Sequence, residues 1–479
     1  MPKNVPTKLL IGGSWRESSD SGSISVIDPA TSETLAEVAN ATVDDAKAAV
    51  HAAYEAQPEW AQTAPRQRGE VLRRAFETMT TRSGEIARLM VLENGKSLTD
   101  ARSEVAYAAE FFRWYSEEAV RMSGLVQTAP SGSNKMLVLR QAIGVAVMVT
   151  PWNFPAAMAT RKIGPALAAG CSVILKPASD TPLTALLLGQ ILEEAGVPAG
   201  VVNILPSNRA SKVVSEMLHD PRVRKLSFTG STAVGRSLLR EASDLVINSS
   251  MELGGNAPFI VFADADMDAA IEGAMIAKMR NGGEACTAAN RFYVQEPVVK
   301  EFVQKLSAAM GALKLGPGLD EGTQLGPLIN LPAIEKVQML VGNAVDRGAS
   351  VRLGGDVVNR KGYFYQATVL DDVPPDSAIL AEEIFGPVAP VVSFATEDEV
   401  VTLANNTEFG LVSYLYTGDL KKGLRVSERL EAGMVGLNRG IVSDPAGPFG
   451  GIKQSGLGRE GGHEGILEYT ESKYIATSW

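Results

Sequence analysis

Residues 144–177 read GVAVMVTPWNFPAAMATRKIGPALAAGCSVILKP, and this stretch decides the fold. Gly144 to Thr150 and Ser172 to Lys176 are short apolar runs, and Ala156 to Ala169 between them has helical spacing of its apolar residues. A run that is apolar on both faces is typical of a parallel strand covered by helices on both sides. The stretch therefore predicts a strand, a helix and a second, parallel strand.

The same alternation continues toward the C-terminus in two series. The first adds a helix at Thr181 to Ala195 and strands at Val201 to Leu205 and Lys225 to Phe228. The second runs from near Met251 to about Leu437 and includes strands at Pro258 to Phe262 and Phe292 to Gln295, with helices at Met267 to Arg280 and Pro297 to Ala312. We predict an α/β fold of two Rossmann-like, doubly wound parallel-sheet domains that meet at Gly254-Gly255. Such sheets bind ligands at the carboxyl ends of their strands.

The N-terminal part before this stretch is of a different kind. The first forty residues favour hairpins, with turn signals at Gly12-Gly13 and Asp28-Pro29. Thr42 and Asp45 resemble a capping box, which marks the start of a helix. Helical spacing then predicts three helices, at Val43 to Trp60, Arg66 to Leu92 and Asp100 to Met122. A strand is predicted after them at Met136 to Gln141.

Composition narrows the class of protein. The 479 residues are 45% hydrophobic and 21% charged, with a net charge of -10, which is typical of a globular protein and excludes a basic nucleic-acid-binding surface. The chain has no apolar run near the roughly 18 residues of a membrane span and no secretory signal, so we expect a cytoplasmic protein without a membrane partner. Two cysteines and three histidines provide neither a disulfide framework nor a metal cluster.

Three polar positions are candidates for catalysis. Cys286 lies in a polar, glycine-containing loop where a thiol can react, whereas Cys171 lies in an apolar run and is interpreted as a core residue. Glu252 stands between a strand and a glycine pair, so it is either a general base or a surface charge. Asn153, between two prolines, either stabilises an oxyanion or bonds its own turn.

Two glycine patterns are candidates for a dinucleotide site. Residues 226–235, LSFTGSTAVG, predict a strand that turns at Gly230 into a helix, where free N–H groups and the Ser231 hydroxyl can bind an anion. An ordinary turn with an N-cap serine explains the pattern equally well. Lys176, at a strand end, is either a ligand contact or a solvated residue. Residues 456–461, GLGREG, match GxGxxG without a strand-turn-helix context, and we interpret them as a coincidental match.

Six motifs in order resemble the aldehyde dehydrogenase superfamily almost from end to end. They are PWNFP (151–155), KP (176–177), FTGS (228–231), ELGG (252–255), the Cys286 loop (280–291) and EIFGP (383–387), and the likeness finishes with PFGGIKQSG (448–456). The resemblance implies a cofactor-binding domain (1–122 and 142–253), a catalytic domain (254–437), and a small β oligomerisation arm with the C-terminal tail (123–141 and 438–479). It also implies a homodimer or homotetramer.

The resemblance further implies how the residues act. Cys286 would attack an aldehyde, the Asn153 amide and the Cys286 N–H would hold the oxyanion, and Glu252 would activate the water that hydrolyses the thioester. The family's cofactor contacts fall on Trp152, Lys176, Ser179, Gly230, Ser231, Gly235, Glu383 and Phe385. Many NAD-preferring relatives carry Glu where Ser179 stands. A serine can donate to a 2′-phosphate that a carboxylate repels, so we expect NADP, with NAD possible.

Within the superfamily, the chain is most similar to succinate-semialdehyde dehydrogenases. The likeness lies in residues 156–170, 252–262 and 280–281, and it implies that Arg161, Arg280 and Ser443 grip a distal carboxylate. Structural salt bridges are the alternative role for both arginines. The chain departs from the family pattern at Glu284, where an amide is usual, at Ala288, where a second cysteine would form a redox switch, and in residues 444–447.

Three other functions compete with this interpretation. The same mechanism could act on an uncharged aromatic or aliphatic aldehyde, which arginines turned away from the pocket would favour. A cofactor-independent hydrolase could pair Cys286 with His219 or His463. A non-enzymatic structural relative, like the lens crystallins, is disfavoured because Cys286, Glu252 and Asn153 are all present.

Overall fold

The apolar runs of residues 144–177 form the middle of a sheet in the computed structural model, which describes residues 5–478. The parallel strands lie side by side in the order β9 (Val202–Ile204), β8 (Ser172–Lys176), β7 (Val145–Val149), β10 (Val223–Thr229) and β11 (Asn248–Glu252). In chain order this is 3-2-1-4-5, the Rossmann order, so the winding reverses between β7 and β10. The short strands β1 (Leu9–Ile11), β2 (Ser14–Arg16) and β21 (Gly456–Leu457) extend the edges of the sheet with antiparallel pairing.

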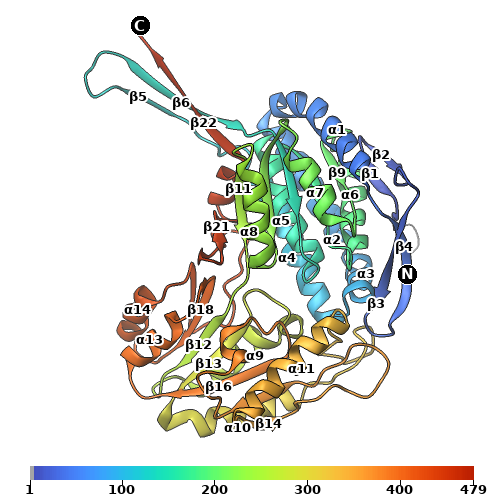
Figure 1. Ribbon diagram of the computed structural model, residues 1–479. Coiled ribbons are helices and arrows are strands. Elements are labelled where there is room, and N and C mark those ends of the chain that lie inside the picture. Colours follow the sequence, from blue (N-terminus) through green and yellow to red (C-terminus); the bar gives the residue numbers. More distant parts are fainter. Residues whose placement is uncertain (1–4, 479) are drawn as a thin grey trace.

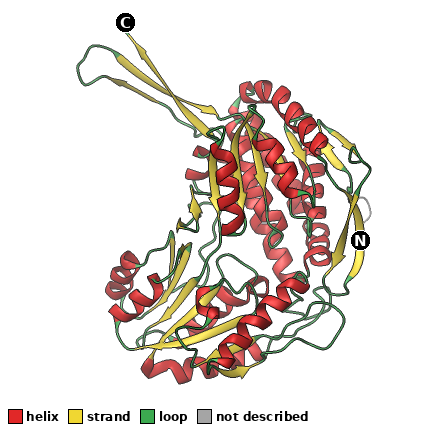
Figure 2. Cartoon of the chain, viewed as in Figure 1, coloured by secondary structure: helices red, strands yellow, loops and turns green. Residues whose placement is uncertain are grey.

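Helices cover both faces of this first sheet (Figure 2). Alternate residues of β7 point to opposite sides, because side chains alternate along a strand. Ala146 and Met148 pack in one core with α2 (Pro65–Thr81), α3 (Ser83–Asn94), α4 (Leu98–Glu118), α5 (Pro155–Ala169) and α6 (Pro182–Glu194). Val145 and Val147 pack in another core with α1 (Val43–Gln62), α7 (Ala210–Leu218) and α8 (Thr232–Ser243). The apolar character of β7 on both faces is therefore explained by burial on both faces.

One predicted helix is wrong. The sequence predicts a single helix from Arg66 to Leu92, but the chain turns at Arg82, whose ψ of 14° separates α2 from α3. The guanidinium of Arg82 forms ion pairs with Glu85, in the first turn of α3, and with Glu194 at the end of α6. The turn lets α3 pack against α4 and α6. A straight continuation of α2 would carry these residues away from both helices. The predicted capping box at Thr42 and Asp45 is confirmed.

The second series of strands forms a separate sheet. Its strands lie in the order β14 (Ser350–Leu353), β15 (Thr368–Asp371), β16 (Val388–Phe394), β13 (Ala289–Gln295), β12 (Ala257–Val261), β18 (Val412–Tyr416) and β19 (Met434–Leu437), and all but β14 run parallel. One face packs on α9 (Met267–Met279) and α10 (Val299–Gly311). The other packs on α11 (Leu331–Asp346), α12 (Ala378–Ala381), α13 (Glu397–Asn405) and α14 (Leu420–Arg429).

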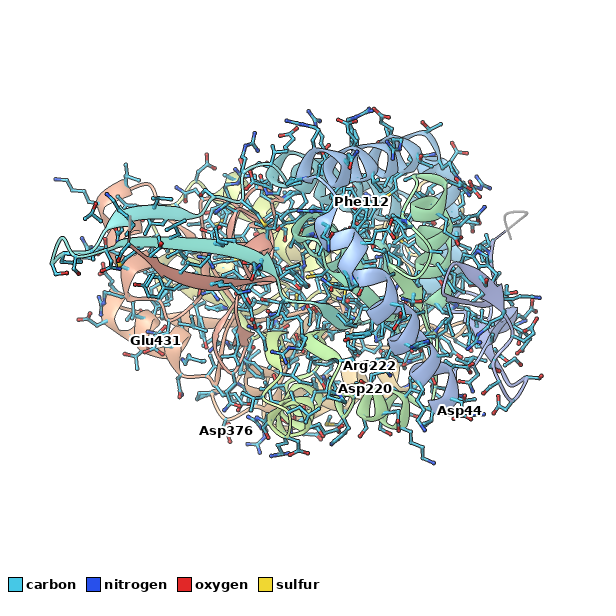
Figure 3. All side chains as sticks on the ribbon, turned by 90° about the horizontal axis from the view of Figure 1, so that it is seen from above. Asp44, Phe112, Asp220, Arg222, Asp376 and Glu431 are labelled. Atoms are coloured by element: carbon cyan, nitrogen blue, oxygen red, sulfur yellow. The ribbon has the colours of Figure 1, made fainter. Side chains whose placement is uncertain are left out.

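A three-stranded arm projects from the body (Figure 1), and Figure 3 shows it from above. It contains β5 (Leu125–Thr128), β6 (Lys135–Ala142) and β22 (Thr470–Thr477), and β22 pairs with β6 from Thr470 opposite Ala142 to Thr477 opposite Lys135. The predicted class, two Rossmann-like domains with a small β arm, is confirmed. The exact domain limits stay a prediction, and residues 1–4 and 479 lie outside the described residues.

The remaining short elements lie at the margins of these parts. The predicted N-terminal hairpins are β1 with β2 and β3 (Ser23–Asp28) with β4 (Glu33–Ala39), while β17 (Phe409–Gly410) pairs with β20 (Ile452–Lys453). A last short helix, α15 (Glu464–Leu467), precedes the arm strand β22. Across residues 5–478, no helix combines the length and the apolar character that crossing a membrane demands.

Candidate active site

A cavity of about 350 Å³ lies where the two sheets meet. The first sheet supplies the ends of β7 and β10 and the residues after β11, whereas the second supplies the segments that lead into β12, β13 and β16. The carboxyl ends of the strands in the first sheet thus face the amino ends of the strands in the second. The prediction that the ligand site lies at the carboxyl ends of the strands therefore holds for the first sheet only. The cavity lies at the point where the winding of the first sheet reverses, which is where doubly wound sheets bind ligands.

The structure brings half of the predicted site residues to this cavity and places the others around it. Its lining includes Trp152, Asn153, Gly230, Ser231, Cys286, Glu383 and Phe385. The predicted residues outside the lining are Glu252, Gly235, Arg161, Arg280, Ser443, Lys176 and Ser179. The lining also contains Met158 and Thr229, which lie in the quoted stretches but were not predicted as site residues, and Lys336, which lies in no motif. Lys336 follows a proline at the start of α11, a position that carries no signal without the fold.

Cys286 is a half-buried thiol in the loop between α9 and β13. Desolvation raises the pKa of this thiol to about 12, while the guanidinium groups of Arg161 and Arg280 act to lower it. The thiol is therefore protonated at rest near neutral pH. The main chain of Cys286 packs closely against Gly255, one of the two glycines at the predicted domain boundary. A Cβ atom at position 255 would lie 2.4 Å from the Cys286 carbonyl oxygen, so only glycine fits there.

Asn153 reaches across from the first domain to the catalytic loop of the second. Its Nδ2 donates to the main-chain oxygen of Glu284 at 3.0 Å, two residues before Cys286. The side chain does not simply bond its own turn, which was the alternative interpretation of this residue. Because a carboxamide has two N–H donors, the second stays available to a group in the cavity.

Glu252 is the last residue of β11, and its side chain is buried. Neither carboxyl oxygen has a hydrogen-bond partner among the described residues. Burial and the nearby carboxylate of Glu460 raise its pKa well above the usual value, although Arg161 and Lys162 act in the opposite direction. Glu252 therefore holds its proton more strongly than an exposed glutamate does, and it is not the surface charge that the alternative interpretation assumed.

Arg161 lies on α5, every residue of which is buried. Its guanidinium forms an ion pair with Glu460, and the guanidinium carbon Cζ lies 4.3 Å from the centre of the Phe449 ring. Lys162 donates to the same carboxylate at 2.5 Å. Although burial raises it, the pKa of Glu460 is held below its usual value by Arg161 and Lys162. One carboxylate thus compensates two buried cations.

Arg280 lies at the end of α9, beside the catalytic loop. Its Nη2 donates to the hydroxyl of Thr287 at 3.3 Å, and its guanidinium lies over the Phe154 ring. The buried phenol of Tyr107 lies within electrostatic reach of both Arg161 and Arg280, and so does Cys286. Both arginines therefore act electrostatically on the thiol and on the Tyr107 phenol. Ser443 is half-buried in the loop that precedes β20.

The cavity has several features suited to a dinucleotide. Gly230 and Ser231 lie at the N-terminus of α8, where Ser231 Oγ accepts from the Val234 N–H and unpaired N–H groups favour an anion. Phe385 has a left-handed backbone, with φ of 57°, and its ring meets Trp152 edge-on at 5.4 Å. Strained backbone at a non-glycine residue is typical of functional sites. Burial raises the pKa of Glu383 to about 7, and its carboxyl accepts from the Gly255 N–H.

Lys176 and Ser179 lie outside this lining. Lys176 is buried at the end of β8, and burial lowers its pKa to about 8. Ser179 lines a separate cavity of about 180 Å³ with Asn208 and Asn330. The adenosine end of a dinucleotide would have to extend from the larger cavity toward these residues along the carboxyl edge of the first sheet.

The histidines do not support a Cys-His hydrolase. His219 pairs with Asp244 at 3.1 Å and His463 with Glu118 at 2.7 Å, and neither belongs to the lining that contains Cys286. A proton-accepting imidazole must lie within hydrogen-bond reach of the thiol that it activates.

A doubly wound pair of domains with a cysteine in the cleft between them defines a nucleotide-dependent enzyme with a covalent step. The family model described as "Aldehyde dehydrogenase family" matches residues 15–475, and the chain belongs to this family. It is an oxidoreductase that acts on an aldehyde, as its motifs predict.

Similar proteins share the whole architecture. A succinate-semialdehyde dehydrogenase of Paenarthrobacter nicotinovorans is 59% identical, over 92% of this chain and 98% of that one. A glutarate-semialdehyde dehydrogenase of Pseudomonas putida is 48% identical, over 98% of both chains. The crystal structure of an E. coli NADP-dependent enzyme superposes with a TM-score of 0.98 at 46% identity, over 99% of this chain and 98% of that one. The predicted likeness to succinate-semialdehyde dehydrogenases is confirmed.

Glu284 provides a test of the site's electrostatics. Its carboxyl is buried, accepts from the Ile329 N–H at 3.1 Å, and has a pKa that burial raises to about 8. Between its usual pKa and pH 8, the folded protein keeps a proton that the unfolded chain releases, so stability falls as the pH rises. Glu284→Gln carries no such proton. We expect the melting temperature of the variant, relative to the parent, to rise steadily from pH 5 to pH 8 and then to level off.

Thermal melts in matched buffers across this range provide the measurement. The other buried carboxyls titrate in both proteins, so the difference between the two isolates Glu284. A difference that is constant with pH would show that Glu284 is already ionised in the folded protein.

Proposed function

We propose that this chain oxidises succinate semialdehyde, an aldehyde with a distal carboxylate, to the dicarboxylic acid, with NADP as the hydride acceptor. The observation that carries the proposal is that two arginines lie beside the cavity of Cys286: Arg161 Nη2 lies 3.3 Å from the sulfur of Met158 in the cavity lining, and Arg280 donates to Thr287, the residue after Cys286. A guanidinium is the side chain best suited to bind a carboxylate, because its planar fork donates two parallel hydrogen bonds.

The charges around the thiol support an anionic substrate. Arg161 and Lys162 share the carboxylate of Glu460, and Arg280 forms no ion pair among the described residues. The Nη2 of Arg161 lies 3.3 Å from the sulfur of Met158, a weak acceptor that a carboxylate oxygen could replace. Met158 itself lines the cavity. The excess positive charge therefore lies at the edge of the reaction space.

The covalent step follows from the residues that meet at the cavity. After releasing its proton to solvent water, the Cys286 sulfur adds to the aldehyde carbon, and the carbonyl oxygen becomes an oxyanion. The free N–H of the Asn153 amide and the main-chain N–H of Cys286 hold that oxyanion. This adduct places a hydrogen on a carbon next to an electron-rich oxygen, so the hydrogen can leave as hydride and a thioester remains on Cys286.

The cavity fits a nicotinamide dinucleotide. The N-terminus of α8, the buried and unpartnered Thr229 hydroxyl and Lys336 offer donors for its phosphates and ribose, and Phe385 with Trp152 offers an aromatic wall. When bound there, the nicotinamide would accept the hydride. Glu252, once ionised, takes a proton from water, which attacks the thioester and releases the acid.

The residues near the adenosine end favour NADP. Ser179 can donate to a 2′-phosphate, and Lys176 can supply positive charge. The similarity to a structure described as an NADP-dependent enzyme agrees with this preference.

Two other substrates remain as alternatives. Glutarate semialdehyde is one methylene longer, and a relative that is 48% identical bears its name. The ion pair of Arg161 with Glu460 favours an uncharged aldehyde instead, since it offers the guanidinium a structural role.

The substrate proposal is tested by Arg280→Met, which removes the charge and keeps a similar volume. We expect kcat/KM for succinate semialdehyde to fall about a hundredfold, because a charged hydrogen-bonded pair contributes roughly 1.5–3 kcal/mol. Propanal, which has no carboxylate, should be oxidised at close to the parent rate. The measurement is reduced cofactor formed at saturating NADP, with glutarate semialdehyde and benzaldehyde as further substrates.

Cys286→Ser is the control, because it should abolish oxidation of all these aldehydes while NADP still binds. Equal losses with propanal and succinate semialdehyde in Arg280→Met would contradict a carboxylate-binding role. A parent enzyme that prefers benzaldehyde would favour the uncharged alternative.

The cofactor proposal is tested by Ser179→Glu. The new carboxylate should repel the 2′-phosphate and accept from a 2′-hydroxyl, so kcat/KM should fall at least tenfold with NADP and hold or rise with NAD. Initial rates with each cofactor measure the ratio, and Ser179→Ala separates the loss of the hydroxyl from the gain of charge. An unchanged ratio in Ser179→Glu would place the adenosine elsewhere.

We also infer that the arm joins subunits into a homodimer or homotetramer. The arm carries exposed apolar side chains on all three strands: Leu125 (48%), Val126 (68%), Leu139 (41%), Tyr474 (56%) and Ile475 (39%). The pairing places Val126, Leu139 and Ile475 on one face of the arm and Leu125 and Tyr474 on the other, and exposed apolar residues on both faces are typical of an arm that packs between subunits. We expect Val126→Asp combined with Tyr474→Asp to lower the mass measured by light scattering to that of a smaller assembly. An unchanged mass at micromolar concentration would exclude these residues from the interface.

A further inference from the structure

A buried polar cluster lies behind the loop that carries Asn153. The chain between α3 and α4, together with the first turns of α4, contacts this loop at three successive points. Asn94 Nδ2 donates to the Trp152 carbonyl at 3.1 Å, and Lys96 Nζ donates to the Asn153 carbonyl at 2.7 Å. Glu104 accepts from the N–H groups of residues 156 and 157 at 2.9 and 3.2 Å, at the start of α5.

Lys96 and Glu104 form an ion pair that is almost fully enclosed. Their side chains are 1% and 0% exposed, and Lys96 Nζ donates to Glu104 Oε2 at 2.5 Å. Lys96 also lies over the ring of Phe154, whose ring is in turn close to the guanidinium of Arg280. A buried ion pair is a poor source of stability, because desolvation offsets the attraction between its charges. Its directional bonds, in contrast, can hold a peptide group in one orientation.

Asn281 completes the cluster from the second domain. It is buried and has a left-handed backbone, with φ of 55°. Its Nδ2 lies 3.0 Å from both the Asn153 carbonyl and the Glu284 carbonyl. The same Glu284 carbonyl accepts from Asn153 Nδ2. Asn281 therefore bridges the loop of the first domain and the cysteine loop of the second.

We propose that Lys96, Glu104 and Asn281 are positioning residues that aim the Asn153 amide at the oxyanion formed on Cys286. The proposal rests on the proposed function, in which Asn153 holds that oxyanion. With its carbonyl bound by Lys96 and Asn281, the Asn153 main chain cannot rotate freely. With one N–H bound to Glu284, the amide cannot flip without turning its own oxygen toward a carbonyl, so the second N–H keeps one direction.

A preorganised donor acts on the transition state and not on the bound substrate. Loss of an oxyanion-hole donor typically lowers kcat by about 10²–10³-fold. A donor displaced by about 1 Å can lower the rate by about 10²-fold. The cluster should therefore affect kcat more than KM. It should also affect every reaction that forms an oxyanion at Cys286, whether or not cofactor is present.

The experiment compares two cluster variants with one direct and one distant control. Lys96→Met with Glu104→Gln removes both charges together, and Gln keeps an oxygen for the N–H groups of α5. Asn281→Gly removes the bridging amide and tolerates the left-handed backbone. Asn153→Ala is the direct control. Lys225→Met with Glu468→Gln is the distant control, since it neutralises another buried lysine-carboxylate pair, 3.3 Å apart.

Four quantities are measured on each full-length protein. Oxidation of succinate semialdehyde and hydrolysis of p-nitrophenyl acetate without cofactor both form an oxyanion at Cys286. Alkylation of Cys286 by iodoacetamide forms none, and NADP affinity reports on the cofactor site alone. We expect both cluster variants to lose about ten- to a hundredfold in kcat for oxidation and esterolysis. Alkylation rate and NADP affinity should stay within about twofold of the parent, as should all four quantities in the distant control.

Each other outcome overturns a stated part of the argument. Parent-like oxidation and esterolysis in both cluster variants, with a loss in Asn153→Ala, would overturn the positioning role and leave the proposed function intact. Parent-like esterolysis in Asn153→Ala would overturn the oxyanion role itself. Parallel losses of alkylation rate and NADP affinity in the cluster variants would assign the cluster to folding alone.

Discussion

The hydrogen bond from the Asn153 amide to the Glu284 carbonyl joins the two sheets at the reaction space. Each sheet has cores of its own, and Ala285 and Ala288, on either side of Cys286, pack in the core of the first domain, so apolar packing brings the cysteine loop close to that domain. A contact between domains must therefore specify direction as well as proximity. Hydrogen bonds do this because their strength falls steeply with misalignment, whereas apolar contacts tolerate sliding.

The charges near the thiol follow a second constraint. Buried carboxyls keep their protons unless a cation compensates them, and this rule separates two glutamates that lie close together. Arg161 and Lys162 contact Glu460 and hold its pKa below the usual value, whereas Glu252 has no partner among the described residues for either oxygen and its pKa is raised well above the usual value. The site thus combines a carboxyl group with a raised pKa, Glu252, and a neighbouring carboxyl group with a lowered pKa, Glu460. Such a division suits a reaction in which a base is needed only after the hydride has left.

Much of the fold could be predicted from local sequence signals. The strand Ser172–Lys176 was predicted to the residue, and α5 nearly so, because a proline starts the helix and Gly170, with φ of 97°, ends it. The break between α2 and α3 at Arg82 could not be predicted, because no glycine or proline marks it and an ion pair with the distant Glu194 holds it. The motifs identified Cys286 and Asn153. Lys96, Glu104 and Lys336 carry no motif, and Lys96 meets Asn153 only because the fold joins segments 57 residues apart.

The opposed polarity of the two sheets explains why the site needs polar contacts on both sides. The first sheet presents strand ends and the N-terminus of α8, which are suited to an anionic cofactor but carry no nucleophile. The second presents the segments that enter its strands, and one of these carries the thiol. Neither domain alone contains both the sulfur and the amide that holds the oxyanion. Activity therefore depends on the relative placement of the two domains, and residues that fix this placement matter to catalysis without touching the substrate.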